Sequence, residues 1–247
     1  LGTAYRDLIL SEVPIMATWD DHDFCQNNYG ASCPLYNGVD FRPISQKNFL
    51  HNLNIPNNED PRHSTQEGVY TSNIFAESQT ERTHVITLDA RYHRSPTYTS
   101  YGGCEGVEST MLGDAQWTWL RGEFNRKSEV KVIASGIQVL PPVVAEDLTC
   151  CARSDSASRL AFEAAVASLG ETGLQGTHYE SWAEIPWERE LLLRLAQQSL
   201  NDGNARAIVF VSGDQHWGEL MRKELPAHAD FGDAQFVFEV SARDMTQ

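Results

Sequence analysis

Four consecutive ionisable residues stand between positions 18 and 24, in the stretch TWDDHDF: Asp20, Asp21, His22 and Asp23. Repulsion raises the free energy of ionising neighbouring carboxylates unless they share protons or bind a cation. Carboxylate oxygens are the ligands that hard cations prefer, and an imidazole extends the choice to transition metals. The stretch therefore predicts a metal site. The alternative is that Asp20 and Asp23 only cap a short helix.

A second group of this kind lies in the stretch SGDQHWGEL, where Asp214 and His216 alternate just after an apolar run. Alternating side chains in an extended turn bring a carboxylate oxygen and an imidazole nitrogen within reach of one ion, and Asp21 can add a second carboxylate. Mixed ligation suits iron, zinc or manganese, whereas an oxygen-rich neighbouring site suits calcium or magnesium. Taken alone, His216 is more often a hydrogen-bonded structural histidine.

The stretch LDARYHRSP places Arg91 and Arg94 directly after another apolar run. Two metal ions a few ångströms apart can activate a water and neutralise the charge of a phosphoryl transition state, and a nearby guanidinium adds to that stabilisation. Carboxylates, imidazoles and Arg91 in one site would therefore indicate phosphoryl chemistry. On its own, each arginine is more often a surface salt-bridge partner.

The elements that must position these groups form an α/β pattern. Strands that are apolar nearly throughout are expected to be buried on both faces, under helices or a second sheet. Runs of β-branched and apolar residues predict strands at 13–18, 83–90, 129–136, 207–213 and 234–241. Helical spacing and caps predict helices at 114–124, with Asp114 as N-cap, at 156–170 and from Pro186. A short helix is predicted at 44–53. The polar groups follow the carboxyl ends of strands, where loops of open α/β sheets converge over one crevice.

Length and composition predict one domain, 1–247, because no stretch rich in Ser, Gly or Pro is long enough to act as a flexible linker. The formal net charge of −15 argues against non-specific binding to nucleic acid or anionic lipid. No apolar run in the sequence reaches the roughly 18 residues of a membrane span.

The five cysteines follow no C-x-x-C zinc spacing, and their odd number leaves at least one unpaired. In an oxidising compartment, either Cys150 or Cys151 could bridge to Cys104. Reduced or structural thiols are expected rather than a cysteine nucleophile, because no paired base stands nearby in the sequence.

Six motifs occur in this order: ATWDDHDF, LDARYHRSP, LGDAQWTWL, VIASGIQVL, ESWAEIPWER and VFVSGDQHWGEL. Together they resemble the PhoD-like alkaline phosphatases of the calcineurin-like metallophosphoesterase superfamily, over nearly the whole chain. The resemblance implies a two-sheet α/β/β/α sandwich with a binuclear site at the strand ends, and hydrolysis of phosphate monoesters or diesters at alkaline pH. It also implies iron and calcium as the ions, with zinc or manganese as the superfamily's alternatives, and a secreted, periplasmic or cell-surface location.

The same resemblance assigns roles to individual residues. Asp21 falls on a metal-binding position, and His22 falls on the histidine that contacts the phosphate and protonates the leaving group, with Asp23 orienting it. Asp214 and His216 fall on the family's final metal-binding Asp-x-His.

Arg91 lies in the family's Leu-Asp-x-Arg segment, which implies phosphate binding or support of the site. Three features depart from the family pattern. Cys25 and Asn28 replace the more usual Gly and Asp, and the ending VSARDMTQ replaces a Ser- and Gly-rich one. The family's early motifs, a strand ending in an Asp or Cys ligand and a Gly-Asp-x-x-Tyr turn that bridges two metals, have no counterpart after Leu1. We therefore expect the chain to correspond to the C-terminal two thirds of such an enzyme, or to an incomplete gene product.

The sequence thus predicts a metal-dependent phosphoric ester hydrolase, a phosphatase or phosphodiesterase, in which a metal-bound hydroxide attacks phosphorus and small-molecule phosphate esters are the partners. One alternative is a non-catalytic metal- or phosphate-binding module with the same fold. Another is an interaction protein whose acidic loops are only a solvated face. If residues 1–247 complete the site by themselves, the candidates to test are Asp23, Asn28, Asp89 and Glu219.

Overall fold

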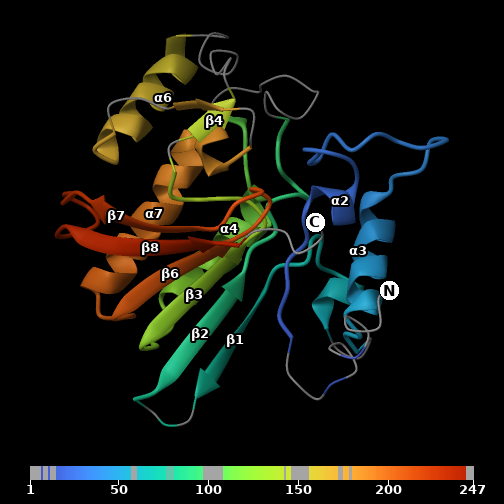
Figure 1. Cartoon of the computed structure of the whole chain (residues 1–247), viewed down its shortest axis with the longest axis horizontal. Helices are drawn as coiled ribbons and strands as arrows, with labels where there is room; N and C mark the ends of the chain where they lie inside the picture. Colours follow the sequence, from blue (N-terminus) through green and yellow to red (C-terminus); the bar gives the residue numbers. More distant parts are fainter. Residues whose placement is uncertain are drawn as a thin grey trace.

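The structure is a computed structural model that describes residues 7, 11, 15–56, 60–76, 78, 80–96, 108–141, 143–145, 156–171, 175–177 and 180–242. Its main element is a six-stranded sheet in the order β1-β2-β3-β6-β8-β7 (Figure 1). The six strands are β1 (Thr71–Ala76), β2 (Arg82–Thr87), β3 (Val130–Ser135), β6 (Ala207–Ser212), β7 (Glu219–Leu225) and β8 (Gln235–Ser241). A separate parallel pair consists of β4 (Val143–Ala145) and β5 (Gln175–Thr177).

The four central strands β2, β3, β6 and β8 run parallel, and the edge strands β1 and β7 are antiparallel to their neighbours. All four parallel strands therefore end at the same edge of the sheet. The helical elements are α2 (Asp21–Phe24), α3 (Arg42–Asn52), η1 (Pro61–His63), α4 (Gly113–Phe124), α6 (Ser156–Ser168), η3 (Trp182–Glu184) and α7 (Pro186–Asn201). None of the helices in the described part of the chain is long and apolar enough to cross a membrane.

One face of the sheet is buried under α4 and α7, which lie behind it in Figure 1. Alternate strand residues point to that face, such as Ile133 in β3, Phe210 in β6 and Val237 in β8, and all three are fully buried. They belong to one hydrophobic cluster with Trp117 of α4 and Leu193 of α7. Because every second side chain of a strand points to the same face, these residues form the core between the sheet and the helices.

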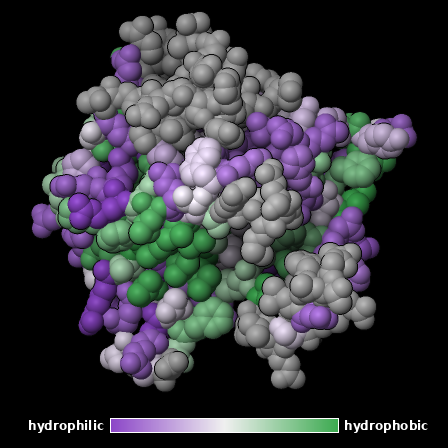
Figure 2. Space-filling model, viewed as in Figure 1, coloured by the Kyte–Doolittle hydropathy of each residue, from purple (hydrophilic) through white to green (hydrophobic). Residues whose placement is uncertain are grey.

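The opposite face of the sheet is apolar but only partly covered by the described residues. The strand register aligns Val85, Val132, Val209 and Phe238 in one row across four strands. Phe238 is 37% exposed, and the edge residue Leu220 is 77% exposed. Figure 2 shows a hydrophobic area on the side of the molecule where Figure 1 shows the uncovered sheet. We call this surface the open sheet face.

The predicted α/β class is confirmed, and so are the strands expected around 83–90, 129–136, 207–213 and 234–241. The helices expected from 114, from 156, from Pro186 and at 44–53 are also present. The strand predicted at 13–18 is wrong where the structure describes it, because residues 15–20 have no regular secondary structure and pair with no strand. Asp114 is not the N-cap of α4 but lies in its first turn, after the N-cap Leu112.

The strands β3 and β6 were expected to be buried on both faces, but their residues alternate between buried and half-buried. Strand β7 was not predicted, because its sequence ELMRKEL mixes charged and apolar residues without an apolar run. The alternation in β3 and β6 shows that the helices cover one face only within the described residues.

We expect the open sheet face to bind an apolar dye and to promote self-association, because exposed apolar areas of this kind are interaction sites. A Phe238→Lys, Val240→Lys double variant should lower dye fluorescence and the apparent mass in sedimentation at equal concentration. The matched control is Ala115→Lys with Thr118→Lys, which adds the same charge on the exposed side of α4. Equal effects of the two double variants would contradict the role of the open sheet face.

Candidate metal and phosphate site

The segment 18–20 carries the first acidic residues to the sheet, where it crosses the carboxyl ends of β2 and β3. The Thr18 Oγ1 hydroxyl donates to the Leu88 carbonyl at 2.5 Å, and Trp19 Nε1 donates to Asp89 Oδ1 at 2.9 Å. A Cβ atom at Gly136 would lie 2.8 Å from the Trp19 carbonyl oxygen. Glycine at the end of β3 is therefore required for this close approach.

Asp89 ties this segment to two others. Its Oδ1 also accepts the backbone N–H groups of Arg91 at 2.8 Å and Tyr92 at 2.9 Å, and its Oδ2 accepts that of Val69 at 2.8 Å. With Trp19 Nε1, four donors from three segments converge on one buried carboxylate. Asp89, which was a candidate for completing the metal site, thus uses both oxygens within the fold.

Three carboxylates meet at this edge of the sheet. One oxygen each from Asp20, Asp21 and Asp214 lies within 4.8 Å of the other two. Asp20 and Asp21 stand at the start of α2, and Asp214 follows β6 in a turn where its backbone φ is +66°. Two residues predicted from distant stretches, Asp21 and Asp214, are therefore neighbours, and Asp20 joins them.

The electrostatics of this carboxylate cluster favour a bound cation. Burial, together with the negative charges of Glu180 and Asp20, raises the pKa of Asp214 to about 8. Burial also raises the pKa of Asp20, although Arg91 opposes the shift. Oxygen donors at this spacing suit a hard cation, whose charge would relieve the repulsion. The residues present therefore fit a metal ion.

The backbone fixes the orientation of Asp21, which is only 2% exposed. The backbone N–H of His22 donates to Asp21 Oδ1 at 2.7 Å, and that of Asn28 donates to Asp21 Oδ2 at 2.6 Å. Since a carboxylate oxygen has two lone pairs, each oxygen retains one for a cation.

A buried ion-pair network lies beside the carboxylate cluster. Arg91 Nη2 donates to Asp20 Oδ1 at 2.6 Å and also pairs with Glu180, which pairs in turn with Arg94. Although burial of Glu180 acts in the opposite direction, the two guanidinium groups hold its pKa below the ordinary value. Arg91, Arg94 and Glu180 are all at most 1% exposed, so this is not the surface salt bridge that was the alternative for the arginines.

Sequence reasoning placed Asp20 in the acidic stretch but assigned it no ligand role of its own, and it missed Glu180 as the partner of both arginines. Glu180 is the first residue of the motif ESWAEIPWER, so the motif itself was the available signal. It follows none of the apolar runs predicted as strands, and its proximity to Arg91 arises only from the tertiary structure. Gln215 Nε2 donates to the Glu180 carbonyl at 2.9 Å, and this hydrogen bond helps to hold Glu180 in place.

The other predicted site residues are exposed at the surface around the cluster. These are His22, Asp23 and His216. Asp23 Oδ2 accepts the backbone N–H of Asp20 at 3.2 Å, as a helix-capping residue does. His216 is not among the residues within 4.8 Å of one another, and its role as a ligand stays a prediction, as do the roles of His22 and Asp23.

Glu219 is exposed as well and lies near the carboxyl end of β3. Its Oε2 accepts weak hydrogen bonds from Trp217 Nε1 at 3.2 Å and Gln138 Nε2 at 3.4 Å.

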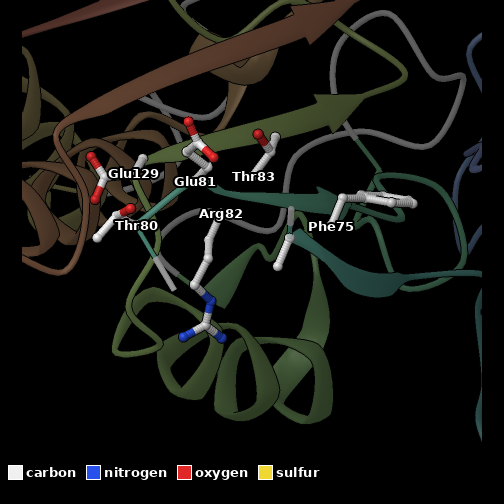
Figure 3. A pocket seen from close by; sticks show the side chains of 7 residues that line it. Phe75, Thr80, Glu81, Arg82, Thr83 and Glu129 are labelled. Carbon is white, nitrogen blue, oxygen red and sulfur yellow. The ribbon is translucent and has the colours of Figure 1, made fainter. Parts of the chain in front are cut away.

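The cavity in Figure 3 does not belong to this site. It has a volume of about 780 Å³ and is lined by residues that include Phe75, Arg82 and Glu129. Arg82 begins β2 and Glu129 directly precedes β3, so the cavity lies at the amino ends of the parallel strands. A strand of this length separates it from the carboxylate cluster by roughly 15–20 Å.

We expect divalent cations such as Ca²⁺ and Mn²⁺ to raise the melting temperature, and the increase to grow as the pH rises through about 8, because the ion competes with the proton on Asp214. Without metal, the stability of the protein is instead expected to fall as the pH rises. The folded state then binds more protons than the unfolded state between pH 3.8 and about 8, so stability decreases with rising pH in that window.

The variant Asp214→Asn should lose both the metal effect and its pH dependence, since an amide carries no titratable charge. Asp233→Asn, at an exposed turn, is the matched control. An equal metal-induced shift in Asp214→Asn and in the unmodified protein, measured by calorimetry from pH 6 to 9, would contradict the assignment.

Comparison with known proteins places the chain in a family. No curated protein matches it. A solved structure of PhoD matches 93% of this chain and 40% of its own chain, with a TM-score of 0.57 and 18% sequence identity. At that identity the likeness shows the fold alone, and the chain spans less than half the length of that protein. The model of the PhoD-like phosphatase family matches residues 5–243. The chain belongs to the PhoD-like phosphatase family.

Proposed function

We propose that this protein is a metal-dependent hydrolase of phosphate esters, acting on monoesters, diesters or both at alkaline pH. The observation that carries the proposal is the carboxylate cluster of Asp20, Asp21 and Asp214 beside the buried Arg91 at the carboxyl edge of the sheet. Metal ions held there, with iron and calcium favoured by the family resemblance and zinc or manganese as alternatives, would supply the positive charge that activates water and stabilises a phosphoryl transition state.

Arg91 is placed to bind or orient the phosphate. Its Nη2 is held by Asp20 and Glu180, which fixes the guanidinium plane. Its Nε and Nη1 are buried and make no hydrogen bond with the described residues. Buried donors without partners are costly, and an anion bound in front of the guanidinium would satisfy them.

We assign the remaining roles to exposed residues of the same edge. His22 directly follows Asp21 and is exposed at the surface, and we assign its imidazole the donation of a proton to the leaving oxygen. Asp23 would limit the imidazole's motion, and His216 would add a nitrogen ligand next to Asp214.

The two-sheet sandwich is part of the proposal. The open sheet face supports it, because an apolar face rich in valine and phenylalanine is suited to pack against a second sheet about 10 Å away. The helices α4 and α7 would then form one outer layer.

A non-catalytic metal- or phosphate-binding module is the second candidate. It is favoured by the size of the cluster, since the three described carboxylates are too few to enclose two ions. Phosphate release separates the two candidates.

The first test is hydrolysis of p-nitrophenyl phosphate and bis(p-nitrophenyl) phosphate at alkaline pH with added Ca²⁺, Fe³⁺, Mn²⁺ or Zn²⁺. We expect turnover that chelation abolishes and metal restores. Binding of metal without any release of p-nitrophenol would favour the binding module, and turnover that survives exhaustive chelation would contradict both.

The second test separates ligands from the acid. Asp214→Asn and His216→Ala should lower the metal content, whereas His22→Ala should retain metal and lower kcat by about 10²- to 10⁴-fold, most for esters with poor leaving groups. His51→Ala, on the exposed side of α3, is the matched control and should change neither. Equal metal loss in all three site variants, measured by elemental analysis, would show that the division of roles is wrong.

A further inference from the structure

We propose that the disulfide Cys25–Cys33 positions Asp21 for metal binding, so that the metal affinity of the carboxylate cluster depends on the oxidation state of these two cysteines. The inference rests on the proposed function only in taking Asp21 as a metal ligand. The structure pairs Cys25 with Cys33, eight positions apart. The other three cysteines, Cys104, Cys150 and Cys151, lie outside the described residues.

The helix that carries Asp21 is too short to hold its own position. It comprises four residues, Asp21–Phe24, and Cys25 follows as its C-cap, with its N–H donating to the Asp21 carbonyl at 2.7 Å. A single helical turn is unstable in isolation because nucleation is unfavourable. Its position must therefore come from tertiary contacts and from the disulfide at its end.

The other half of the disulfide is anchored in a buried aromatic cluster. Cys33 is 9% exposed and packs with Trp19, Phe24 and Tyr92. Trp19 and Tyr92 stack with their ring centroids 6.5 Å apart, and both donate to Asp89. The disulfide therefore links the end of α2 to a part of the fold that is fixed to the sheet.

The loop that the disulfide closes contacts the site directly. Asn28, in the left-handed region with φ +60°, donates its N–H to Asp21 Oδ2 at 2.6 Å and accepts at its carbonyl from Arg94 Nη2 at 2.5 Å. Ala31 N–H donates to the Arg94 carbonyl at 2.8 Å. One loop thus orients a carboxylate of the cluster and an arginine of the neighbouring ion-pair network.

Glycine at position 30 allows this arrangement. A Cβ atom there would lie 2.5 Å from the Arg94 carbonyl oxygen and 2.9 Å from Arg94 Cβ. The loop is therefore pressed against the Arg94 backbone with no space to spare, and a small shift of the loop would move the Asn28 N–H that holds Asp21.

Opening the disulfide would restore the conformational freedom of this loop. A dithiol transfers two electrons and two protons to the S–S bond, which yields the thiols of Cys25 and Cys33 and the oxidised, cyclic form of the dithiol. The loop must then be ordered without a cross-link, and the hydrogen bond that orients Asp21 is weakened. The ion loses a preorganised ligand, and its affinity falls.

The test is calorimetric titration of the oxidised protein with Ca²⁺ and Mn²⁺ alone, compared with the Cys25→Ser, Cys33→Ser double variant. Loss of a hydrogen bond to a charged ligand corresponds to an increase in Kd of about tenfold or more. The control is Leu225→Ala, a buried position at the far end of β7 that lowers stability without touching the loop. We expect Leu225→Ala to bind metal as the unmodified protein does.

Gly30→Ala provides a second variant that keeps the disulfide. It should weaken metal binding in the same direction, because the added methyl group displaces the loop from Arg94. Dithiol treatment of the unmodified protein, followed by removal of the dithiol before titration, should reproduce the double variant, and reoxidation should restore the affinity. The double variant itself should not respond to the dithiol, which excludes an effect of the remaining cysteines.

The proposal is overturned if the double variant and Gly30→Ala bind metal as tightly as the oxidised protein, if Leu225→Ala loses as much affinity, or if the oxidised protein binds neither ion. Because the readout is metal binding without substrate, it is independent of catalysis. Metal binding that depends on the disulfide in a protein that hydrolyses no ester would support this inference while the proposed function fails.

Discussion

The arrangement of the site follows from an imbalance of charge among groups that are buried or half-buried. Two guanidinium groups, those of Arg91 and Arg94, stand against four carboxylates, of which Glu180 takes both arginines as partners. Asp214 is left with negative neighbours and little solvent, and its pKa rises to about 8 in consequence. A polar group that has lost water must find a partner within the protein or in a ligand. A bound cation would correct the imbalance without any rearrangement of the sheet.

The sheet can hold such a charge imbalance because its far side is well packed. The helices α4 and α7 bury one face, and at the carboxyl ends of two central strands Gly136 follows β3 and Gly213 follows β6. Where no strand pairs with these segments, the Asp89 carboxylate accepts their hydrogen bonds instead. Its donors come from the segment 18–20, from Val69 and from its own turn. At this edge, side-chain acceptors thus satisfy the N–H donors that backbone carbonyls satisfy within the sheet.

Much of the fold could be predicted from the sequence, because the apolar runs of β2, β3, β6 and β8 and the start of α7 at Pro186 express local preferences. The same holds for Asp21 and Asp214, which follow apolar runs along the chain and meet at one edge in space. Glu180 could not be found in this way, since a buried ion pair between distant segments leaves no periodic trace. The apolar run at 13–18 was misleading for a similar reason. Its described part pairs with no strand, and Thr18 is held instead by a side-chain hydrogen bond to the Leu88 carbonyl. The Cys25–Cys33 pair was also missed, because spacing alone does not specify connectivity.

The left-handed backbone at Asp214 also has an evolutionary consequence. Most residues are disfavoured there, whereas Asn and Gly are tolerated. Both are one nucleotide away from an aspartate codon, and Asn would preserve an oxygen at the same place while removing its charge. A single transition in the gene could therefore remove one of the three carboxylates of the cluster with the surrounding fold intact. Descendants that still fold but lack one charge of the cluster are thus one nucleotide away from this sequence.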